Sequence, residues 1–433
     1  MREVDSILAD DELLAAIFDA QGRRHERSCR AGRHQTPAEV VLRMLILKHV
    51  RNWSYETLER EVRANLVYRS FCRIGLEKVP DAKTLVRLGL AIGPEVVDAL
   101  HQRIVSLAQA NRVVKGRKMR VDTTVVETNI HYPTDSSLLG DGARVLTRTM
   151  TKVAASKRGG LKAKIRNRMR TVKKRVLEIA LAARQKGPQG EERKKTAYRR
   201  LLSATRKIVN QAERVRAEIE KSRGHVRKLA DELAQTVTRV RQVIRQTVAR
   251  VFRGETHYPG KLASIFEPHT EIIRKGKASK PTEFGKMVQI QEAENQIVTT
   301  YEVFEERPSD SDLLVPAVAS HREQLGKVPR LVAADAGFFS KANEDQLHEM
   351  GVRRVSVPNR NTRSEERRQL QKRRWFKQGQ RWRTGCEGRI SVLKRRHGLS
   401  RCRYRGLTGI KRWVGLGVIA DNLISIGNAL AQS

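Results

Sequence analysis

A long run of heptad-spaced apolar residues between about 145 and 253 constrains this chain most, because it commits that region to packed helices. In segments 165–179, 201–219 and 226–251, apolar residues recur at alternating steps of four and three. That spacing lets helices pack along a common seam. Breaks fall at the Gly- and Pro-containing stretch 186–190 and near Gly224. We therefore expect an antiparallel helical hairpin or small bundle, coiled-coil-like, inserted at 145–255.

The same region carries most of the chain's positive charge. Residues 144–255 hold 33 Lys and Arg against 9 Asp and Glu, which is +24 of the net +40 of the whole chain. A helix surface needs charge for solubility, but balanced charge would serve that purpose. An excess of one sign attracts polyanions, and nucleic acid is the first candidate. We expect the insertion to contact the DNA backbone, with a merely solvated surface as the alternative.

Membrane and secreted proteins are disfavoured. No apolar run approaches the roughly 20 residues of a membrane-spanning helix, and residues 1–20 are acidic and lack the apolar core of a signal peptide. The cysteines are far apart, without a C-x-x-C pair or a histidine at metal-ligand spacing, and are expected to be reduced thiols. They are Cys29, Cys72, Cys386 and Cys402. A cytoplasmic protein with no membrane partner is expected.

An N-terminal segment, 1–35, precedes a helical domain at 36–112 of the helix-turn-helix kind. Thr36 is expected to cap its first helix, with Pro37 at the first helical position and Glu39 completing a capping box. Such a domain suits either binding of DNA ends or dimerisation. Three aromatic residues are expected to pack inside it rather than contact bases: Trp53, Tyr55 and Tyr68.

On either side of the insertion, at 113–144 and 256–433, strand and helix patterns alternate. The first strand, within 119–135, is rich in Val and Thr, and strict alternation places Val121 and Val125 on one face and Asp122 on the other. The later patterns are a hairpin at 283–291 and 296–304, strands at 330–334 and 352–357, and helices at 340–350, around 387 and at 412–430. Residues 309–312, Asp310 among them, are expected to cap a further helix that runs to about 325, and Asp421 and Asn422 are expected to satisfy backbone or buried partners. Before the first strand, the pattern at 94–110, with Pro94 at its start, predicts a long amphipathic helix. This order predicts an α/β sheet layered with helices, interrupted once.

Three carboxylates stand out by their context. Asp122 lies on the first strand, Asp335 ends a later strand, and Glu387 lies on a later helix. Strand ends converge on one edge of such a sheet, and carboxylates that meet there repel each other unless divalent cations bind between them. Two Mg²⁺ ions about 3.5–4 Å apart would hold the attacking and leaving oxygens of one phosphate. A basic protein with such a trio is expected to cut or join phosphodiesters.

The sequence resembles the DDE transposases of bacterial insertion sequences, whose catalytic domain is ribonuclease-H-like. The resemblance rests on segments 122–130, 334–338 and 387–394. In many of these transposases the last segment carries a Tyr, two residues, an Arg, three residues, the Glu, six residues and a Lys. Arg383, Glu387 and Lys394 fit this spacing, whereas Gln380 stands in the position of the Tyr.

The resemblance implies a ribonuclease-H-like core and makes the helical N-terminal domain the end-binding region. Some relatives carry an insertion between the second Asp and the Glu, whereas here the helical insertion comes after the first strand, so its role in clamping the element ends is a hypothesis. The resemblance also implies Mg²⁺-dependent DNA end cleavage and strand transfer, with Asp122, Asp335 and Glu387 as catalytic residues and as ligands of two Mg²⁺ ions, for which Mn²⁺ would substitute. The implied partners are double-stranded DNA, as element ends and target, and a second copy of the chain in a synaptic dimer. The implied location is the bacterial cytoplasm, at the nucleoid. The alternatives are a non-catalytic DNA-binding relative and a hydrolytic nuclease of the same fold.

The helix around Glu387 is also expected to contact DNA. The resemblance makes Arg383 and Lys394 contacts to the terminal phosphate and its neighbouring nucleotides, and ordinary i,i+4 pairing on an exposed helix is the alternative for both. Arg389 and Arg395 belong to the same basic helix. Trp382, like Trp375, sits among basic residues, a setting that suits stacking on an unpaired base; core packing is an equal alternative. A structural role is expected for Glu127.

Overall fold

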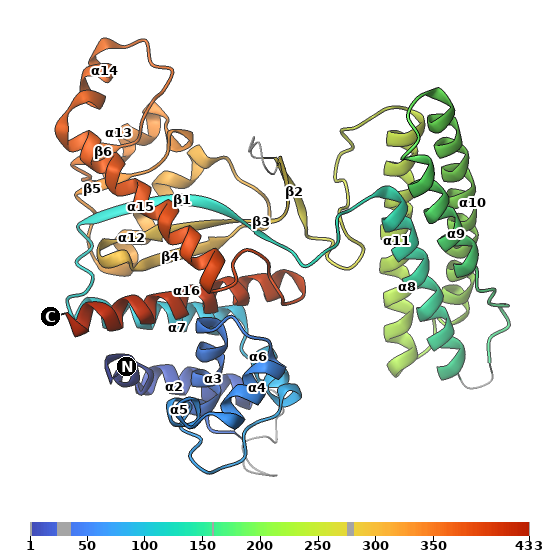
Figure 1. Cartoon of the computed structure of the whole chain (residues 1–433), viewed down its shortest axis with the longest axis horizontal. Coiled ribbons are helices and arrows are strands. Elements are labelled where there is room, and N and C mark those ends of the chain that lie inside the picture. The colour runs from blue at the N-terminus through green and yellow to red at the C-terminus, as the bar shows by residue number, and fades with distance from the viewer. Residues whose placement is uncertain (1, 24–35, 158–159, 275–280, 433) are drawn as a thin grey trace. The chain divides into compact units, whose positions relative to one another are not determined.

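The structure is a computed structural model of the 433-residue chain, and it describes residues 2–23, 36–157, 160–274 and 281–432. The chain forms two compact units (Figure 1). One consists of Met1–Asn129 with Lys275–Ser433, and the other of Ile130–Arg274. The second unit therefore begins before and ends after the insertion expected at 145–255, and residues 36–112 belong to the same compact unit as most of the strands.

The first unit contains a mixed sheet. Five of its strands lie in the order β4-β3-β1-β5-β6. Their bounds are Lys118–Glu127 for β1, Thr282–Glu292 for β3, Val298–Val303 for β4, Leu331–Ala333 for β5 and Arg354–Ser356 for β6. β3 is antiparallel to β1 and β4, whereas β1, β5 and β6 are parallel. The expected mixed α/β architecture is confirmed, and the hairpin and both short strands lie where the residue patterns predicted them.

The central strand β1 is buried on both faces. Met119, Val121, Val125 and Val126 are at most 1% exposed. Both faces are covered because α12 (Leu314–Leu325) and α15 (Arg374–Arg396) both pack against the strand. In the middle of β1, the side chains of Asp122 and its neighbour are only half-buried. This opening is where the candidate site begins.

Helix α15 lies close to the sheet because two glycines remove side chains from its inner face. A Cβ atom at Gly379 would lie 2.6 Å from the Ser356 hydroxyl oxygen, and one at Gly385 would overlap the Arg120 guanidinium. Arg120 is buried between β1 and α15, where it forms an ion pair with Glu292 of β3 and donates to the Trp382 carbonyl. This close packing fixes the position of α15 against β1.

The N-terminal helices pack around the C-terminal helix α16 (Gly406–Ala431) (Figure 1). Their bounds are Arg2–Leu8 (α1), Asp11–Gly22 (α2), Ala38–Val50 (α3), Tyr55–Ala64 (α4), Leu66–Phe71 (α5), Ala82–Ala91 (α6) and Pro94–Ala110 (α7). The expected cap of α3 is wrong: Pro37 is its N-cap residue and no side chain caps it, while Glu39 binds Arg43 at 2.8 Å. The core of this packing is apolar and continuous.

Helix α16 corrects the expectation that no segment is apolar enough to cross a membrane. By length and composition it passes that test among the described residues, with 67% of its apolar window buried inside the structure. Its polar residues satisfy buried partners, as the sequence suggested for Asp421 and Asn422. The Asn422 side chain accepts from the Val298 amide at 2.9 Å and donates to the Val298 carbonyl at 2.8 Å.

Shorter elements complete the first unit. They are η1 (Glu294–Gln296), η2 (Asp310–Leu313), η3 (Ala336–Phe338), α13 (Lys341–Glu349) and α14 (Glu365–Lys372). Cys72, Cys386 and Cys402 are buried free thiols, in accord with the expected reduced state, and Cys29 lies outside the described residues.

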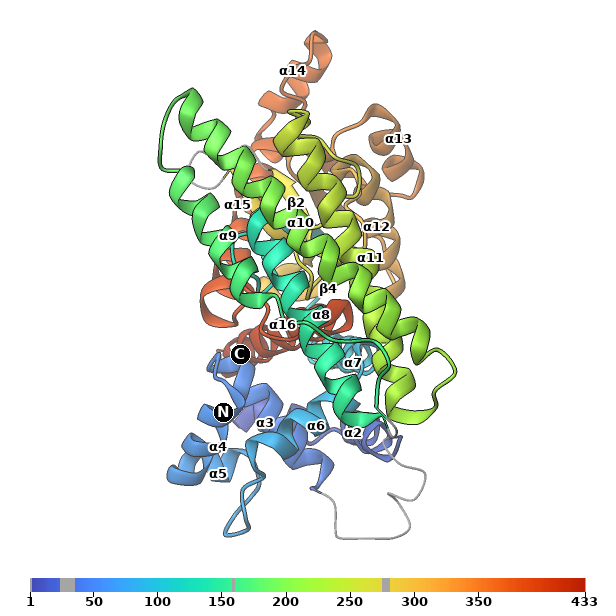
Figure 2. The same ribbon diagram turned by 90° about the vertical axis from the view of Figure 1, so that its right-hand side faces the viewer.

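The second unit is a bundle of long helices (Figure 2). Its helices are α8 (Asp135–Ser156), α9 (Met169–Ala182), α10 (Pro188–Glu218) and α11 (Gly224–Phe252), followed by β2 (Glu271–Arg274). The apolar residues of the heptads form one shared core. The described part of the bundle adds α8 to the three expected helices. Thr134 is the N-cap residue of α8 and forms a capping box with Ser137. The helix therefore begins before the start of the insertion expected at 145–255.

Candidate active site

Asp122 lies at the partly open centre of β1. Its Oδ1 accepts a hydrogen bond from the backbone amide of Thr123 at 2.7 Å. Burial raises the pKa of the Asp122 carboxyl, and the charges of Asp335 and Glu387 act in the same direction. The Thr123 amide and the Arg383 guanidinium partly offset this rise. The sensitivity of one carboxyl to the other two places all three acids in one electrostatic site.

Asp335 lies at the equivalent level of the neighbouring parallel strand. Arg120 pairs with Ala333 in the register of β1 and β5, so that Asp122 and Asp335 each come two residues after a paired position. Asp335 directly precedes η3 and accepts from the Ala336 amide at 2.7 Å. Arg360 Nη2 lies 3.6 Å from its carboxylate. The register thus places the middle of β1 and the end of β5, with their aspartates, at the same level of the sheet.

Glu387 is linked to Asp122 through Arg383, one helical turn earlier on α15. Arg383 Nη2 donates to Glu387 Oε1 at 2.7 Å, and its Nη1 lies 3.7 Å from Asp122 Oδ2. Burial works to lower the pKa of Arg383, but the Glu387 hydrogen bond and the three acidic charges raise it overall. The Arg383 guanidinium thus bridges Asp122 and Glu387, whereas Arg360 is the cation beside Asp335.

The trio is not drawn into a closed metal cage. Across the described part of the chain, no three His, Cys, Asp or Glu side chains lie close enough to hold one ion. Carboxylate oxygens are nevertheless the ligands that Mg²⁺ prefers. Among the described residues, Arg383 Nε is a buried donor with no hydrogen-bond acceptor. The chemistry of the three acids suits a divalent cation, and Arg383 supplies positive charge beside two of them.

Two residues of this site had no distinctive signal in the sequence. Asp310, expected only to cap a helix, accepts from the Thr123 hydroxyl at 3.2 Å beside Asp122. Gln380, which stands where related transposases carry a tyrosine, donates to Ser356 Oγ at 3.2 Å and to the Ala334 carbonyl at 3.3 Å. Gln380 thus ties α15 to the ends of β5 and β6. Neither contact follows from local spacing, because each joins segments distant in the chain.

The basic residues of α15 separate into two groups. Arg395 is exposed and Lys394 half-buried in the last turn. Arg389, in contrast, is 7% exposed, and its Nη1 lies 2.7 and 2.8 Å from the two carboxylate oxygens of Asp421. The expected DNA contact at Arg389 is corrected to a structural one, because this ion pair joins α15 to α16. Lys394 and Arg395 remain candidates.

Trp382 lines a cavity of about 410 Å³ near the start of β1, β5 and β6. Its lining is Arg117, Lys118, Arg330, Leu331, Arg353, Arg354, Trp375, Gln378, Gly379 and Trp382. The Arg120 guanidinium lies 4.8 Å from the centre of the Trp382 ring, and Arg354 lies 5.6 Å from that of Trp375. Both tryptophans are half-buried. The two alternatives stated for them, packing and base stacking, are both compatible with this setting.

The second unit carries a basic groove between the segment before α9 and helix α10. Two adjoining cavities share Arg166, Arg168 and Lys207, and Arg214 lines one of them. Glu218 holds the segment in place by accepting from the Lys157 ammonium at 2.6 Å and from the Lys162 and Ala163 amides, contacts that lower its pKa to about 2. The groove presents positive charge at fixed positions.

Two family models match the chain. Residues 1–88 match the family described as Transposase domain (DUF772), and residues 348–426 match the family described as Transposase DDE domain. The second match contains Arg383 and Glu387, whereas Asp122 and Asp335 precede it. No curated protein and no solved structure matches the chain.

Proposed function

We propose that this chain, whose two family matches support a DDE-type transposase of an insertion element, cleaves the ends of its element and transfers the freed 3′ strands to target DNA. The observation that supports the proposal is the Arg383 guanidinium, which forms ion pairs with Asp122 and Glu387 and whose pKa the charge of Asp335 also raises. Two aspartates on adjacent parallel strands and a glutamate on the covering helix form a cluster of like charge, which is costly unless a cation neutralises it.

Asp122, Asp335 and Glu387 would hold the two Mg²⁺ ions, with Mn²⁺ as a substitute. Bound ions supply Lewis-acid activation of the attacking oxygen and stabilise charge on the leaving oxygen. Arg383 supports this role, because it forms ion pairs with two of these carboxylates, Asp122 and Glu387, and its Nε has no acceptor among the described residues. On release it would be free to donate to a phosphate, the geometry to which a guanidinium is suited.

The strand order supports a ribonuclease-H-like catalytic core. β1 and β3 form an antiparallel pair extended by β4, and β5 and β6 continue the sheet in parallel on the other side of β1. Both aspartates then fall on central strands, and α15 brings Glu387 across them. A dimer is proposed because joining two ends of one element requires that both be held together.

DNA contact is assigned to three surfaces: Lys394 and Arg395 in the last turn of α15, the cavity beside Trp382, and the basic groove of the second unit. The first two flank the carboxylate site on the first unit. The groove supplies sequence-independent attraction to phosphates.

The helical insertion is proposed to clamp the element ends. Deletion of residues 150–250 tests this role and should abolish synapsis of the two ends. Unchanged synapsis would contradict it.

Strand transfer with purified protein, Mg²⁺ and labelled pre-cut element ends tests the proposal. Asp335→Asn and Glu387→Gln should each reduce joined product by roughly 100-fold or more, since each removes a charged ligand. Glu127→Gln is the matched control, because this acid lies on β1, 3.7 Å from Arg401 and outside the trio. A wild-type protein that nicks ends without joining them would be a nuclease. One that binds ends but neither cuts nor joins would be a non-catalytic relative.

A further inference from the structure

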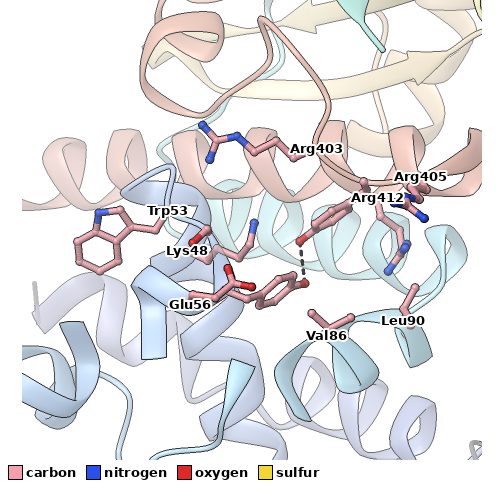
Figure 3. Close-up of a pocket in the computed structure, with 11 residues that line it drawn as sticks. Lys48, Trp53, Glu56, Val86, Leu90, Arg403, Arg405 and Arg412 are labelled. Atoms are coloured by element: carbon pink, nitrogen blue, oxygen red, sulfur yellow. Dashed lines mark hydrogen bonds between the residues drawn. The ribbon is translucent and has the colours of Figure 1, made fainter. Parts of the chain in front are cut away.

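A cavity of about 490 Å³ lies in the first unit, between α3, α4 and α6 and the segment that leads into α16 (Figure 3). Its volume is in the range of small-molecule sites. Three arginines, Arg403, Arg405 and Arg412, lie on one side, and the apolar side chains of Val86 and Leu90 lie on the other (Figure 3). Val86 is 38% exposed and Leu90 63%. None of these residues contributes to the carboxylate site.

Lys48 is the buried cation of this cavity. It is 2% exposed, and its Nζ lies 4.8, 4.9 and 4.7 Å from the ring centres of Tyr55, Tyr404 and Trp413. Within the described residues no ion pair joins Lys48 to an acid. Burial lowers its pKa to about 7, and the Arg403 charge adds to the effect. An ammonium held only by aromatic faces retains donor capacity for a ligand.

The charges decide what class of ligand fits. A cationic ligand is disfavoured for two reasons. Lys48 already occupies the faces of the three aromatic rings, and the three arginines repel a further positive charge. An anion is favoured, and the walls of Val86, Leu90 and the half-buried Trp53 require that it carry an apolar, flat body. Glu56, an exposed acid of the lining, supplies one hydrogen-bond acceptor. Hydrogen bonds from its own amide and from Ser54 lower its pKa, so that it is ionised at neutral pH.

We propose that this cavity binds a single unstacked nucleotide. All four bases carry a hydrogen-bond acceptor beside an N–H donor, so that Lys48 would donate to the acceptor and Glu56 would accept from the N–H. The apolar walls cover the ring, and Arg403 and Arg405 at the exposed rim face the phosphate. Every base also offers a π face for stacking, so the site accepts an unpaired base without selecting among the four.

The source of the nucleotide is a strand of bound DNA, and in this respect the inference rests on the proposed function. The cavity is lined in part by residues within the matched segment 1–88 and in part by residues within 348–426. An unpaired base costs less to extrude than a paired one. A free nucleotide in solution has the same chemistry and is distinguished by the experiment.

Fluorescence anisotropy with the full chain and no metal compares three duplexes of one sequence: fully paired, with one unpaired thymine, and with one unpaired adenine. The two duplexes with an unpaired base should each bind about 10-fold more tightly than the fully paired duplex, within the range of one stacked and hydrogen-bonded base. Leu90→Trp should fill the cavity and remove this preference. Leu66→Trp, at a position 78% exposed on α5 and outside the lining, should keep it. Lys48→Met should reduce the preference for an unpaired base.

Crosslinking locates the base. With 5-iodouracil as the unpaired base, photocrosslinked peptides should contain Trp53, Tyr55 or Tyr404; crosslinks confined to Trp375 or Trp382 would overturn the assignment. Equal binding of all three duplexes overturns the inference for DNA but leaves DNA binding itself intact. A titration with free dGMP or dTMP then separates the remaining cases: protection of Trp53 from oxidation in wild type but not in Leu90→Trp identifies a free nucleotide as the ligand, and no protection overturns the inference entirely. If wild type binds none of the duplexes, the proposed function is contradicted, and the same titration shows by itself whether the cavity binds a nucleotide.

Discussion

The two units of the molecule use charge in opposite ways. In the first unit, arginines are buried with acids from distant parts of the chain: Arg120 with Glu292, Arg367 with Glu344, and Arg389 with Asp421. In the second unit, 33 Lys and Arg against 9 Asp and Glu between 144 and 255 leave no acid for most of the cations. Charge sets internal geometry in the first unit and is directed at an external partner in the second.

This difference separates the two tasks of the proposed function. A buried ion pair adds little net stability to the fold. Removal of one partner, however, destabilises the fold by several kcal/mol, because the other charge is left buried and unpaired, and so the pair fixes the elements that carry it. Exposed cations act over roughly a Debye length and are screened by salt. We therefore expect affinity for DNA to depend on the second unit and on salt, and the chemical step to depend on the exact placement of α15 in the first.

The strongest test of this division neutralises the basic groove. The triple variant Arg168→Gln, Lys207→Gln, Arg214→Gln should weaken DNA binding roughly 100-fold at low salt. The slope of log affinity against log salt should fall by about 0.9 for each phosphate that the variant no longer neutralises. Anisotropy titrations at several NaCl concentrations measure both quantities, and strand transfer at saturating DNA should remain near wild type.

A matched control removes the same number of charges from the second unit at cations that are paired with acids. Lys194, Lys195 and Arg241 form ion pairs with Glu191, Glu192 and Glu213. Their glutamine variants should weaken binding much less than the groove variant. Equal losses in both triple variants would show that net charge, rather than the groove, attracts DNA.

The second test concerns geometry in the first unit and uses two glycines of the same helix. Gly385→Ala brings a Cβ into the Arg120 guanidinium and should destabilise the fold by about 1–3 kcal/mol, the usual cost of overpacking. Gly388→Ala meets no atom within 4 Å and should stabilise α15 by up to about 1 kcal/mol. Denaturant unfolding measures both. Effects of the same sign would mean that α15 does not depend on this close approach.

The sequence predicted local features well where a local cause exists. Helix α7 spans Pro94–Ala110 as its N-terminal proline and apolar spacing indicated, and the β3–β4 hairpin lies where the strand patterns met. Missed features depend on distant partners. Arg389 appeared exposed on a basic helix, yet Asp421 buries it. Gln380 looked like a lost tyrosine, yet it bonds two strand ends.

For the carboxylates, the convergence of strand ends was enough to expect that Asp122 and Asp335 could meet, but not that their strands would be neighbours. Arg383 was expected to contact DNA, with i,i+4 pairing on its helix as the alternative, and its approach to Asp122 was not anticipated. Helical spacing places Arg383 and Glu387 on one face but does not say what that face meets. The catalytic role of the trio stays a prediction that the strand-transfer experiment tests.

The smallest expected effect concerns Lys48, the cation that departs from the pairing rule of its own unit. Its pKa in the folded chain is about 7, against an ordinary 10.5. Between these values the unfolded chain binds the proton more tightly, so wild-type stability should rise with pH through this window. Lys48→Met removes this contribution. From pH 7.5 to 9 the melting temperature of wild type should therefore rise by about 2 °C relative to that of the variant.

The other titratable groups around Lys48 remain in both proteins and cancel in this comparison. Burial also raises the pKa of Tyr55 and of Tyr404, so neither tyrosine ionises early in this range. Lys83→Met, at an exposed lysine of α6, should show the same pH dependence of melting as wild type. A constant difference between Lys48→Met and wild type would mean that Lys48 keeps an ordinary pKa. Lys48 would then be either paired with an acid or exposed to water. In that case Lys48 would be no exception to the pairing of buried charge in the first unit.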